Sequence, residues 1–569
     1  MDSFLTKIKS DTYIILLIVI IAALAYSRTI ENDFVHWDDI DQIIDNPDIS
    51  SLRWENIRSM FTKSYVSMYQ PLVTLSFAIE RALFGVDPRF FHLINLLFHL
   101  ANIVLVYFVV RRLINHTPTA LFAALIFAIH PMHVESVAWV TERKDVLYTF
   151  FYFLALLSYL RYADSQQARS YWFSLLWYTL SLLSKSAAVT FPVLLLLIHW
   201  YQQRPWTKSN LLRFIPFFLL ALAFGIISLL TQTPQGNTSF FESYTAIDRI
   251  FLAFYAIAFY ALHYFAPVGL CVFHPFPTKV NGWLPWNYYV APLVVIGLIA
   301  LLFIRWKDQR MMKFALGFFF LHIVLYLHLF PVGSAVVAER YTYIAYIGLS
   351  IAVAQGAMTI ASHLQWMKKT LVPILLIITI LFSSITYSRV KVWNNTISLF
   401  DDAIKKTGLN ETTGNMLCLG YLSEGIKKLN NADTLGALSD FTKAIQYDST
   451  YYGGYEQRGR LLMKLKRYDE ARRDLSNLIE IAPKDICTAE IFELRGLANL
   501  RLKMYDNALA DFTQALSLDS LYSQAYANRG IVFINLNRNT EACADFQKAY
   551  ELGFHQAQPL LEQYCKGKR

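Results

Sequence analysis

Phe34-Val35-His36-Trp37-Asp38-Asp39 places two adjacent carboxylates a few residues beyond the first long apolar run of this chain. The run begins near Tyr13, and no small-residue cleavage site follows it, so we interpret it as an uncleaved membrane anchor rather than a signal peptide. The loop that carries Asp38 and Asp39 is too polar to re-enter a membrane. The stretch therefore predicts a membrane protein with acidic chemistry just outside its first span.

The composition supports a membrane protein. Of 569 residues, 55% are hydrophobic and only 16% are charged, whereas soluble domains carry about 25% charged residues. The net charge of +9 would suit a nucleic-acid partner. However, the basic residues fall mainly at the ends of apolar runs, which is the positive-inside pattern of membrane proteins. We therefore expect membrane lipids and no nucleic acid as partners.

Apolar runs of nearly 20 residues, the length that spans a bilayer, occur throughout the first 390 residues. We count eleven, which begin near Tyr13, Phe90, Thr119, Asp145, Tyr171, Ala187, Leu211, Tyr288, Lys313, Tyr341 and Thr370. Every second loop is basic, which predicts a cytoplasmic N-terminus and a C-terminus on the other side. Counting the apolar segment 248–265 would reverse the later loops, so we interpret it as a re-entrant or interfacial helix.

The last part of the chain is charged, helical and repetitive. Gly459, Ala471, Leu475, Leu478 and Pro483 recur as Gly496, Ala508, Phe512 and Ala515, and again as Gly530, Ala542, Phe546 and Ala549. We place an earlier copy at Gly420, Ala437, Phe441 and Ala444, with a longer loop at 428–436 between its helices. These spacings predict tetratricopeptide (TPR) repeats, because an unrelated helical bundle need not keep them.

The expected organisation is all α-helical. It comprises a polytopic membrane domain at 1–390, a linker at 391–408 and a TPR α-solenoid at 409–569. The five cysteines show neither CxxC spacing nor an even number, so neither a zinc site nor a disulfide scaffold is predicted.

Asp38 and Asp39 are the leading catalytic candidates. A carboxylate can accept a proton from a hydroxyl, and of two adjacent acids one can act as base while the other orients an acceptor or a metal. The simpler interpretation is a solvated loop with helix-capping aspartates. The position just outside the first span, flanked by Phe34 and Trp37, favours the catalytic role.

A second candidate group follows the third apolar run, at His130, His133 and Glu135. Ionisable groups near membrane depth are costly and tend to mark function. Histidines three residues apart lie on one face of a helix and can bind a metal; the alternative is an interfacial pair that caps a kinked helix. A divalent metal ion therefore stays open as a cofactor, with Asp39, His130 and His133 as candidate ligands.

Cations in the outer loops suit a phosphate group. Lys185 offers a point charge, and Arg340, directly after Glu339, offers a bidentate clamp. For Lys185 alone, extension toward lipid headgroups is the simpler interpretation. Gln70 and His274 also fall in outer loops and are candidates for lining a site.

These pieces together resemble the GT-C glycosyltransferase superfamily, and within it the membrane-plus-TPR O-mannosyltransferase-like proteins of animals and their bacterial relatives. The resemblance extends over nearly the whole chain and rests on these motifs in order: Trp37-Asp38-Asp39, Pro71-Leu72, Phe91 to Asn95, His130 to Trp139, Arg143-x-Asp145, Ser184-Lys185, Glu339 to Tyr343 and the TPR repeats. Two positions depart from the family pattern, where Ser186 and His199 stand in place of acids.

The resemblance implies an inverting transfer from a polyprenyl-phosphate-linked sugar to Ser or Thr hydroxyls of proteins outside the cytoplasm. Asp38 would act as the base with help from Asp39, while Arg340, Lys185 and Arg143 would hold the lipid phosphate. The TPR arm would bind the acceptor protein on the periplasmic or lumenal side of a bacterial inner membrane or an ER-like membrane. The alternatives are an O-oligosaccharyltransferase that uses a lipid-linked oligosaccharide, a glycan or lipid acceptor, and a non-catalytic TPR scaffold for envelope assembly.

Overall fold

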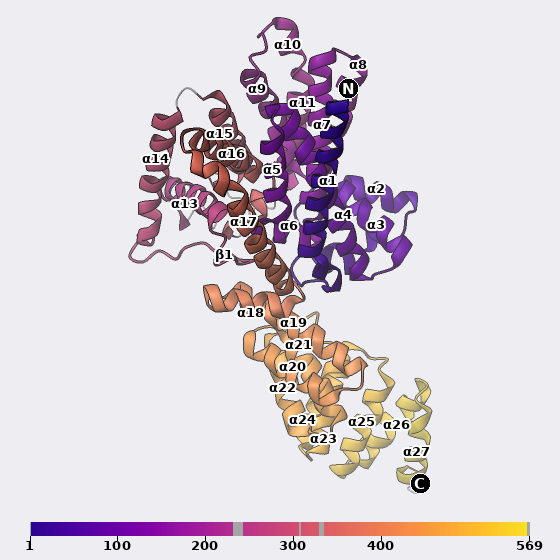
Figure 1. The fold of residues 1–569 in the computed structure, drawn as a ribbon. Coiled ribbons are helices and arrows are strands. Elements are labelled where there is room, and N and C mark those ends of the chain that lie inside the picture. Colours follow the sequence, from indigo (N-terminus) through magenta and orange to yellow (C-terminus); the bar gives the residue numbers. More distant parts are fainter. Residues whose placement is uncertain (1, 232–242, 307–308, 329–334, 566–569) are drawn as a thin grey trace. The chain divides into compact units, whose positions relative to one another are not determined.

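The computed structural model describes residues 2–231, 243–306, 309–328 and 335–565. The chain divides into two compact units, Met1–Gly408 and Leu409–Arg569, and both are built from helices (Figure 1).

Long helices make up most of the first unit. They are α1 (Asp2–Ala25), α4 (Pro88–Ile114), α5 (Thr117–Ile129), α7 (Arg143–Ser165), α8 (Ala168–Ser184), α9 (Phe191–Tyr201), α11 (Ile215–Thr231), α13 (Ala246–Phe265), α14 (Trp286–Trp306), α15 (Arg310–Ile323), α16 (Ala345–His363) and α17 (Gln365–Val392). Shorter helices fill the loops: α2 (Trp54–Thr62), α3 (Pro71–Phe84), α6 (Val134–Ala138), α10 (Lys208–Leu212) and α18 (Thr396–Thr407). The segment 391–408, expected to be a linker, thus contains the end of α17 and all of α18.

The first unit is an integral membrane domain, but the count of eleven spans is not confirmed. Among the described residues, seven helices are long and apolar enough to cross a bilayer, or eight if one bent pair counts as a span. The seven are Asp11–Glu31, Pro88–Ile114, Val140–Ser165, Lys208–Thr231, Ala246–Phe265, Ala345–His363 and Lys369–Val392. The runs that begin near Tyr171 and Lys313 form α8 and α15, which have only 17 and 14 residues.

The structure differs from two further predictions about the spans. The segment 248–265, which we interpreted as re-entrant or interfacial, lies in α13, a 20-residue helix with the length and composition of a span. The run near Thr119 is broken instead, because Pro131 interrupts it and α5 meets the next helical segment at 57°. That break brings polar side chains to the end of α5.

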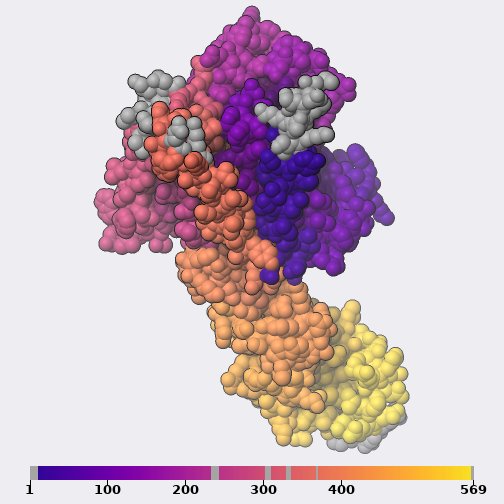
Figure 2. All heavy atoms as spheres, in the orientation of Figure 1, coloured from indigo at the N-terminus to yellow at the C-terminus, as the bar shows by residue number. Residues whose placement is uncertain are grey.

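The surface of the first unit suits a membrane. Helices α1 and α17 contact each other, and they cross the same face of the unit in indigo and salmon (Figure 2). Both expose large apolar side chains, including Leu17 and Leu24 of α1 and Leu376 and Ile380 of α17. In a water-soluble protein so many exposed apolar side chains on neighbouring helices would be unusual, whereas lipid covers them in a membrane.

The described part of the first unit contains one small sheet. Strand β1 (His274–Pro275) pairs antiparallel with β2 (Ala335–Val337), with His274 opposite Val337. The pairing fixes the start of the segment that leads to Glu339 and Arg340.

The second unit is a row of helical hairpins. Its helices are α19 (Glu411–Asn430), α20 (Thr434–Tyr447), α21 (Tyr452–Lys464), α22 (Tyr468–Ile481), α23 (Ala489–Arg501), α24 (Tyr505–Leu518), α25 (Ser523–Asn535), α26 (Asn539–Glu551) and α27 (Gln558–Tyr564). In each of the last two full hairpins a glycine of the first helix lies against a phenylalanine of the second, as Gly496 does with Phe512 and Gly530 with Phe546. A side chain at these glycines would collide with the ring, so close packing of the hairpin requires glycine there.

In the earliest hairpin the observed register differs from the predicted one. Gly425, not Gly420, lies against Phe441, and the separation of 16 residues equals that of Gly496 and Phe512. Helix α19 also continues to Asn430, so the expected long loop at 428–436 is only a short connection before α20.

Three Arg–Asp pairs recur along this unit, and we call them the Arg–Asp ladder: Arg458–Asp474, Arg495–Asp511 and Arg529–Asp545. Each pair joins the two helices of one hairpin, and each arginine donates to both carboxylate oxygens of its partner. Such bidentate pairs fix geometry as well as charge.

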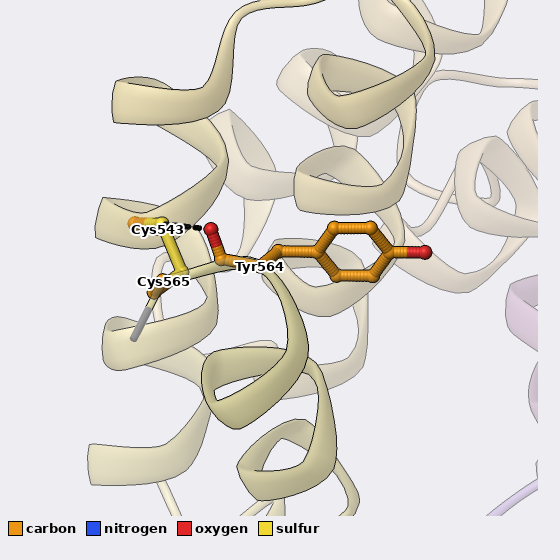
Figure 3. Close-up of a disulfide and its surroundings, with 3 residues drawn as sticks. All are labelled: Cys543, Tyr564 and Cys565. Atoms are coloured by element: carbon orange, nitrogen blue, oxygen red, sulfur yellow. Dashed lines mark hydrogen bonds between the residues drawn. A yellow bond between two sulfur atoms is a disulfide. The ribbon is translucent and has the colours of Figure 1, made fainter. Parts of the chain in front are cut away.

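A disulfide, which the cysteine count did not predict, joins Cys543 in α26 to Cys565 after α27 (Figure 3). The pairing depends on α27 folding back onto α26, which the sequence spacing alone does not reveal. It attaches the final helix to the last hairpin.

Candidate functional site

Asp39 holds the first loop of the membrane unit in place. Its carboxylate accepts hydrogen bonds from the backbone amides of Val35, at 3.0 Å, and Thr141, at 3.1 Å. Burial raises the pKa of Asp39 to about 7, although these hydrogen bonds oppose the shift. Asp39 thus ties the loop after α1 to the segment before α7, and this contact positions its neighbour Asp38.

Asp38 keeps some access to solvent, with 8% of the residue exposed. Its Oδ2 lies 3.8 Å from Nζ of Lys144. Burial raises the pKa of Asp38, and the Lys144 ammonium partly opposes this shift. A carboxylate whose pKa is moved toward neutrality is a better proton acceptor than an ordinary solvated one, provided that it is still ionised.

Lys144 belongs to a group of charges centred on Glu142. Oε1 of Glu142 lies 3.0 Å from Nζ of Lys144 and 3.3 Å from Nε of Arg340, and its Oε2 lies 3.8 Å from Nζ of Lys185. One carboxylate therefore faces three cations from separate parts of the chain. We call the following residues the Glu142 cluster: Asp38, Glu135, Glu142, Lys144, Asp145, Lys185 and Arg340.

Two further acids hold the cations of this cluster. Nη1 of Arg340 forms an ion pair with Oε1 of Glu135, and the Arg340 backbone amide donates to Oε2 of the same carboxylate at 3.0 Å. Nζ of Lys185 pairs with Asp145, which also accepts a hydrogen bond from Ser136 at 3.0 Å. The break after α5 places Glu135 and Ser136 where they make these contacts.

The cations lie nearer to the surface than the acids that hold them. The side chains of Arg340 and Lys185 are 17% and 14% exposed, whereas those of Glu135, Glu142 and Asp145 are at most 2% exposed. An anion that approaches the cluster therefore meets Arg340 and Lys185 before it meets Glu135, Glu142 or Asp145, whereas the Asp38 side chain is 11% exposed.

Aromatic rings support the cluster. The ring of Trp139 lies 5.3 Å from Nζ of Lys144 and 5.6 Å from Cζ of Arg340. Trp37 packs against Trp139 at 5.7 Å between centroids and stacks on Phe400 of α18 at 5.4 Å. The backbone amide of His36 also donates to Oγ1 of Thr396, at the start of α18. Helix α18 therefore packs directly on the loop that carries Asp38.

Arg143, which the resemblance assigned to the donor phosphate, lies outside the cluster. Its guanidinium pairs with Glu80, contacts Asn95 and donates to the Phe91 carbonyl at 2.9 Å. The side chain is fully buried. Arg143 thus joins α7 to α3 and α4, and it has no free face for a phosphate.

The three candidate metal ligands do not form one site, although the rings of His130 and His133 lie 5.6 Å apart. Nε2 of His130 lies 3.1 Å from the Tyr264 carbonyl, and Nδ1 of His133 lies 2.9 Å from the Phe127 carbonyl. Asp39 instead accepts the two backbone hydrogen bonds described above. Across the described ranges, no three His, Cys, Asp or Glu side chains are grouped so that they could hold a metal ion.

The remaining candidates border the cluster or lie apart from it. Glu339 is buried next to Arg389, with 3.5 Å between Nη2 and Oε1, and burial raises the pKa of Glu339 to about 8 even though Arg389 opposes the shift. Gln70 donates to Oε1 of Gln42 at 2.8 Å. Burial lowers the pKa of His274 to about 4. In the described part of the chain, none of these three side chains pairs with Lys144, Lys185 or Arg340 of the Glu142 cluster.

From the motif Arg143-x-Asp145, the resemblance implied a role only for Arg143. In the structure Lys144 and Asp145 both contact the Glu142 cluster, whereas Arg143 turns toward α3 and α4. Successive side chains on a helix point about 100° apart, and the sequence alone does not reveal which of them face the site. The contact between α18 and Trp37 could not be predicted from the sequence, because the two segments lie near opposite ends of the membrane unit along the chain.

The fold and the Glu142 cluster define an integral membrane protein that joins a helical GT-C-type region to TPR repeats. Residues 70–231 match the family described as dolichyl-phosphate-mannose-protein mannosyltransferase. Residues 452–485, 489–520 and 523–552 match the tetratricopeptide repeat, which confirms the last three of the four predicted copies. The first of these matches contains Glu142 and Lys185 but neither Asp38 nor Arg340.

The chain is similar to TMTC3 along nearly its whole length and to other TMTC proteins over shorter stretches. It is 24% identical to the human protein O-mannosyl-transferase TMTC3, over 95% of this chain and 64% of that protein. It is 37% identical to mouse protein O-mannosyl-transferase TMTC1, over 25% of this chain and 16% of that protein. The chain thus spans less than two thirds of the length of these relatives. A crystal structure of MamA protein matches 25% of this chain and 76% of its own, with 22% identity and a TM-score of 0.24.

Proposed function

We propose that the protein is an inverting O-glycosyltransferase that moves a sugar from a polyprenyl-phosphate donor to Ser or Thr hydroxyls of proteins outside the cytoplasm. The observation that carries the proposal is the Glu142 cluster, where Asp38 stands next to cations that are open to an anionic ligand. The homology to proteins named protein O-mannosyl-transferases supports the reaction class.

In this reaction Asp38 takes the proton of the acceptor hydroxyl while the hydroxyl oxygen attacks the anomeric carbon of the sugar. The bond from that carbon to the phosphate oxygen breaks, and its electron pair leaves with the polyprenyl phosphate. A single displacement from the face opposite the leaving group inverts the anomeric configuration. The proton ends on Asp38 and the sugar on the acceptor.

Arg340 and Lys185 hold the phosphate and stabilise the charge that it gains as it leaves. Charges placed in advance where negative charge develops are usually the largest single contribution to catalysis. The buried acids Glu135 and Asp145 keep these cations in position before the donor arrives. Lys144 favours the ionised form of Asp38, and Asp39 acts as a positioning residue for its loop.

The TPR unit binds the acceptor on the side of the membrane where Asp38 lies. The Cys543–Cys565 disulfide supports a position outside the cytoplasm, because disulfides persist mainly in oxidising compartments. An extended acceptor held by the repeats would reach Asp38 without crossing the membrane.

The test uses the purified full chain in lipid nanodiscs, with polyprenyl-phosphate mannose as the first donor and a Ser/Thr-rich peptide as acceptor. Mass spectrometry measures the transfer. Asp38→Asn should lower turnover by roughly 10²–10⁴-fold, since it keeps size but removes the proton acceptor. Asp45→Asn is the matched control, because Asp45 is an exposed acid of the same loop. Equal transfer by both variants would rule out Asp38 as the base.

A further inference from the structure

A cavity lies at the end of the membrane unit opposite the Glu142 cluster. Helix α7 begins at the cluster, with Asp145 in its first turn, and 16 residues later, roughly 24 Å along the axis, it reaches Arg161. Helix α4 runs alongside and ends with Arg111 and Arg112. These ends of α4 and α7, with the start of α8, enclose an open cavity of about 570 Å³.

Arginines give this cavity an excess of positive charge. Arg112 pairs with Asp164 at 2.7 Å, but the same carboxylate also pairs with Arg204 at 2.6 Å. Arg111 donates to the neutral side chain of Asn115 at 2.7 Å. Within the described residues, neither Arg111 nor Arg161 forms an ion pair. Two guanidinium groups of the lining therefore lack a direct carboxylate partner among the described residues, and Arg111 lies beside Tyr107, which donates to Asp11.

The other walls of the cavity are apolar and open to the surroundings of the unit. Phe108 of α4 and Phe173 of α8 are 49% and 38% exposed, and Leu154 and Leu157 of α7 also belong to the lining. Because α4 has the length and composition of a membrane span, the exposed ring of Phe108 is suited to contact lipid, and Phe173 lines the same cavity. The cavity thus joins a cationic end to a hydrocarbon-facing wall.

We propose that this cavity binds an anionic phospholipid, with the phosphate of the headgroup between Arg111 and Arg161 and an acyl chain along Phe108 and Phe173. A planar guanidinium matches the oxygen geometry of a phosphate and binds it through two parallel hydrogen bonds. A free phosphate would satisfy the arginines but would leave the apolar wall without a partner. The wall is the reason to assign the site to a lipid.

The alternative is that the arginines only orient the membrane domain. Basic residues at the ends of spans do so without any bound ligand, by the positive-inside rule. That role requires positive charge but no cavity and no particular arginine. The two explanations therefore differ in whether removal of Arg111 and Arg161 changes the preference for one lipid over another.

The test compares lipid binding by the purified full chain in detergent, measured by native mass spectrometry. The probes are phosphatidylglycerol and phosphatidylcholine with identical acyl chains, and inorganic phosphate serves as competitor. The wild type should bind phosphatidylglycerol at least tenfold more tightly than phosphatidylcholine. The double variant Arg111→Ala/Arg161→Ala should lose this preference, and Arg111→Lys/Arg161→Lys should keep only part of it.

Lys208→Ala is the matched control and should behave as the wild type. Lys208 is an exposed cation at the start of α10. Helix α10 lies at the same end of the unit as the cavity, because Tyr171 of α8 donates a hydrogen bond to the carbonyl of Arg213, which follows α10. If the double alanine variant does not fold, Arg161→Ala alone replaces it, since Arg161 is exposed. An unchanged lipid preference in the arginine variants would overturn the site. Displacement of phosphatidylglycerol by an equal concentration of inorganic phosphate would overturn the lipid assignment.

Discussion

The two units of this chain use buried charge in different ways. In the Arg–Asp ladder of the TPR unit each carboxylate has one guanidinium partner. In every pair the aspartate follows its arginine by 16 residues. In the Glu142 cluster one carboxylate faces three cations. Exposure does not separate the two sets, because the ladder arginines are 20–23% exposed, slightly more than Arg340 and Lys185.

The difference lies in how far each charge is satisfied. A bidentate Arg–Asp pair uses most of the hydrogen-bonding capacity of both partners, so it serves to hold two helices together. In the Glu142 cluster each of the three cations is instead shared between two carboxylates, so no pair is exclusive. The contrast indicates that shared rather than exclusive ion pairs, more than burial, distinguish the candidate site from a structural brace.

Removing one arginine from each set should give the largest contrast. Arg340→Ala should lower transfer to a short peptide by about 10²–10³-fold, comparable to loss of one donor to a developing negative charge. Arg340→Lys should recover little, because lysine lacks the planar fork that engages Glu135 and a phosphate. Arg495→Ala should leave this transfer unchanged. Equal effects of Arg340→Ala and Arg495→Ala, measured at equal protein abundance, would remove the distinction.

Truncation after Gly408 tests whether the TPR unit only presents the acceptor. The truncated chain should transfer to a short peptide at high concentration nearly as well as the full chain does. Transfer to a full-length acceptor protein should fall by up to about 10²-fold, since the loss is one of effective concentration. The ratio of the two rates is the measurement. If both acceptors lose the same factor, the repeats contribute to the reaction centre itself.

The pH dependence of transfer tests the contact between Lys144 and Asp38. Transfer requires ionised Asp38, so the rate should fall as the pH drops through the pKa of Asp38. Because burial raises that pKa, this acid limb of the pH–rate profile should have its midpoint at a higher pH than an ordinary aspartate would give. Lys144 lowers the pKa of Asp38, so Lys144→Gln should move the midpoint of the limb to higher pH. Lys63→Gln, which removes a cation paired with Asp48, is the control and should not move it. A midpoint that shifts to lower pH in Lys144→Gln would contradict the assignment.

The smallest effect is expected in the stability of the TPR unit. Arg495→Ala should lower its free energy of unfolding by about 1–3 kcal/mol, because Asp511 is nearly buried and loses its charged partner. Asn499 still donates to Asp511 at 2.8 Å, which limits the loss. Arg473→Ala removes an exposed partner of Asp469 and should change stability by less than about 0.5 kcal/mol. Denaturant titration of both variants measures the difference.

Much of the fold follows from the sequence, and the errors have physical causes. The repeats were predictable because Gly, Ala and Phe recur at fixed separations. The earliest hairpin was placed five residues out of register at Gly420, although Gly425 is the glycine that keeps the 12-residue spacing to Ala437 seen in the other copies, and it packs on Phe441. The count of eleven spans is not confirmed, since α8 and α15 are shorter than their apolar runs suggest and the run near Ala187 forms another short apolar helix.

The site was predictable in part. Asp38, Glu135, Lys185 and Arg340, chosen from the sequence, meet in one cluster, although their roles stay predictions. Lys144 and Glu142 were missed because the direction of a side chain at the start of a helix depends on the neighbours against which that helix packs. Arg143 was chosen instead, and its partner Glu80 gave no sign in the sequence of an ion pair with it.

The central claim is that Asp38 acts on the acceptor while the cations of the Glu142 cluster hold the donor. The most direct test measures donor binding and transfer in the same preparation of Asp38→Asn, with the donor and peptide described above. The variant should bind the donor within about threefold of the wild type while transfer falls by roughly 10²-fold or more, because only the proton acceptor is lost. Transfer at the wild-type rate, or an equal loss of donor binding and transfer, would contradict this account.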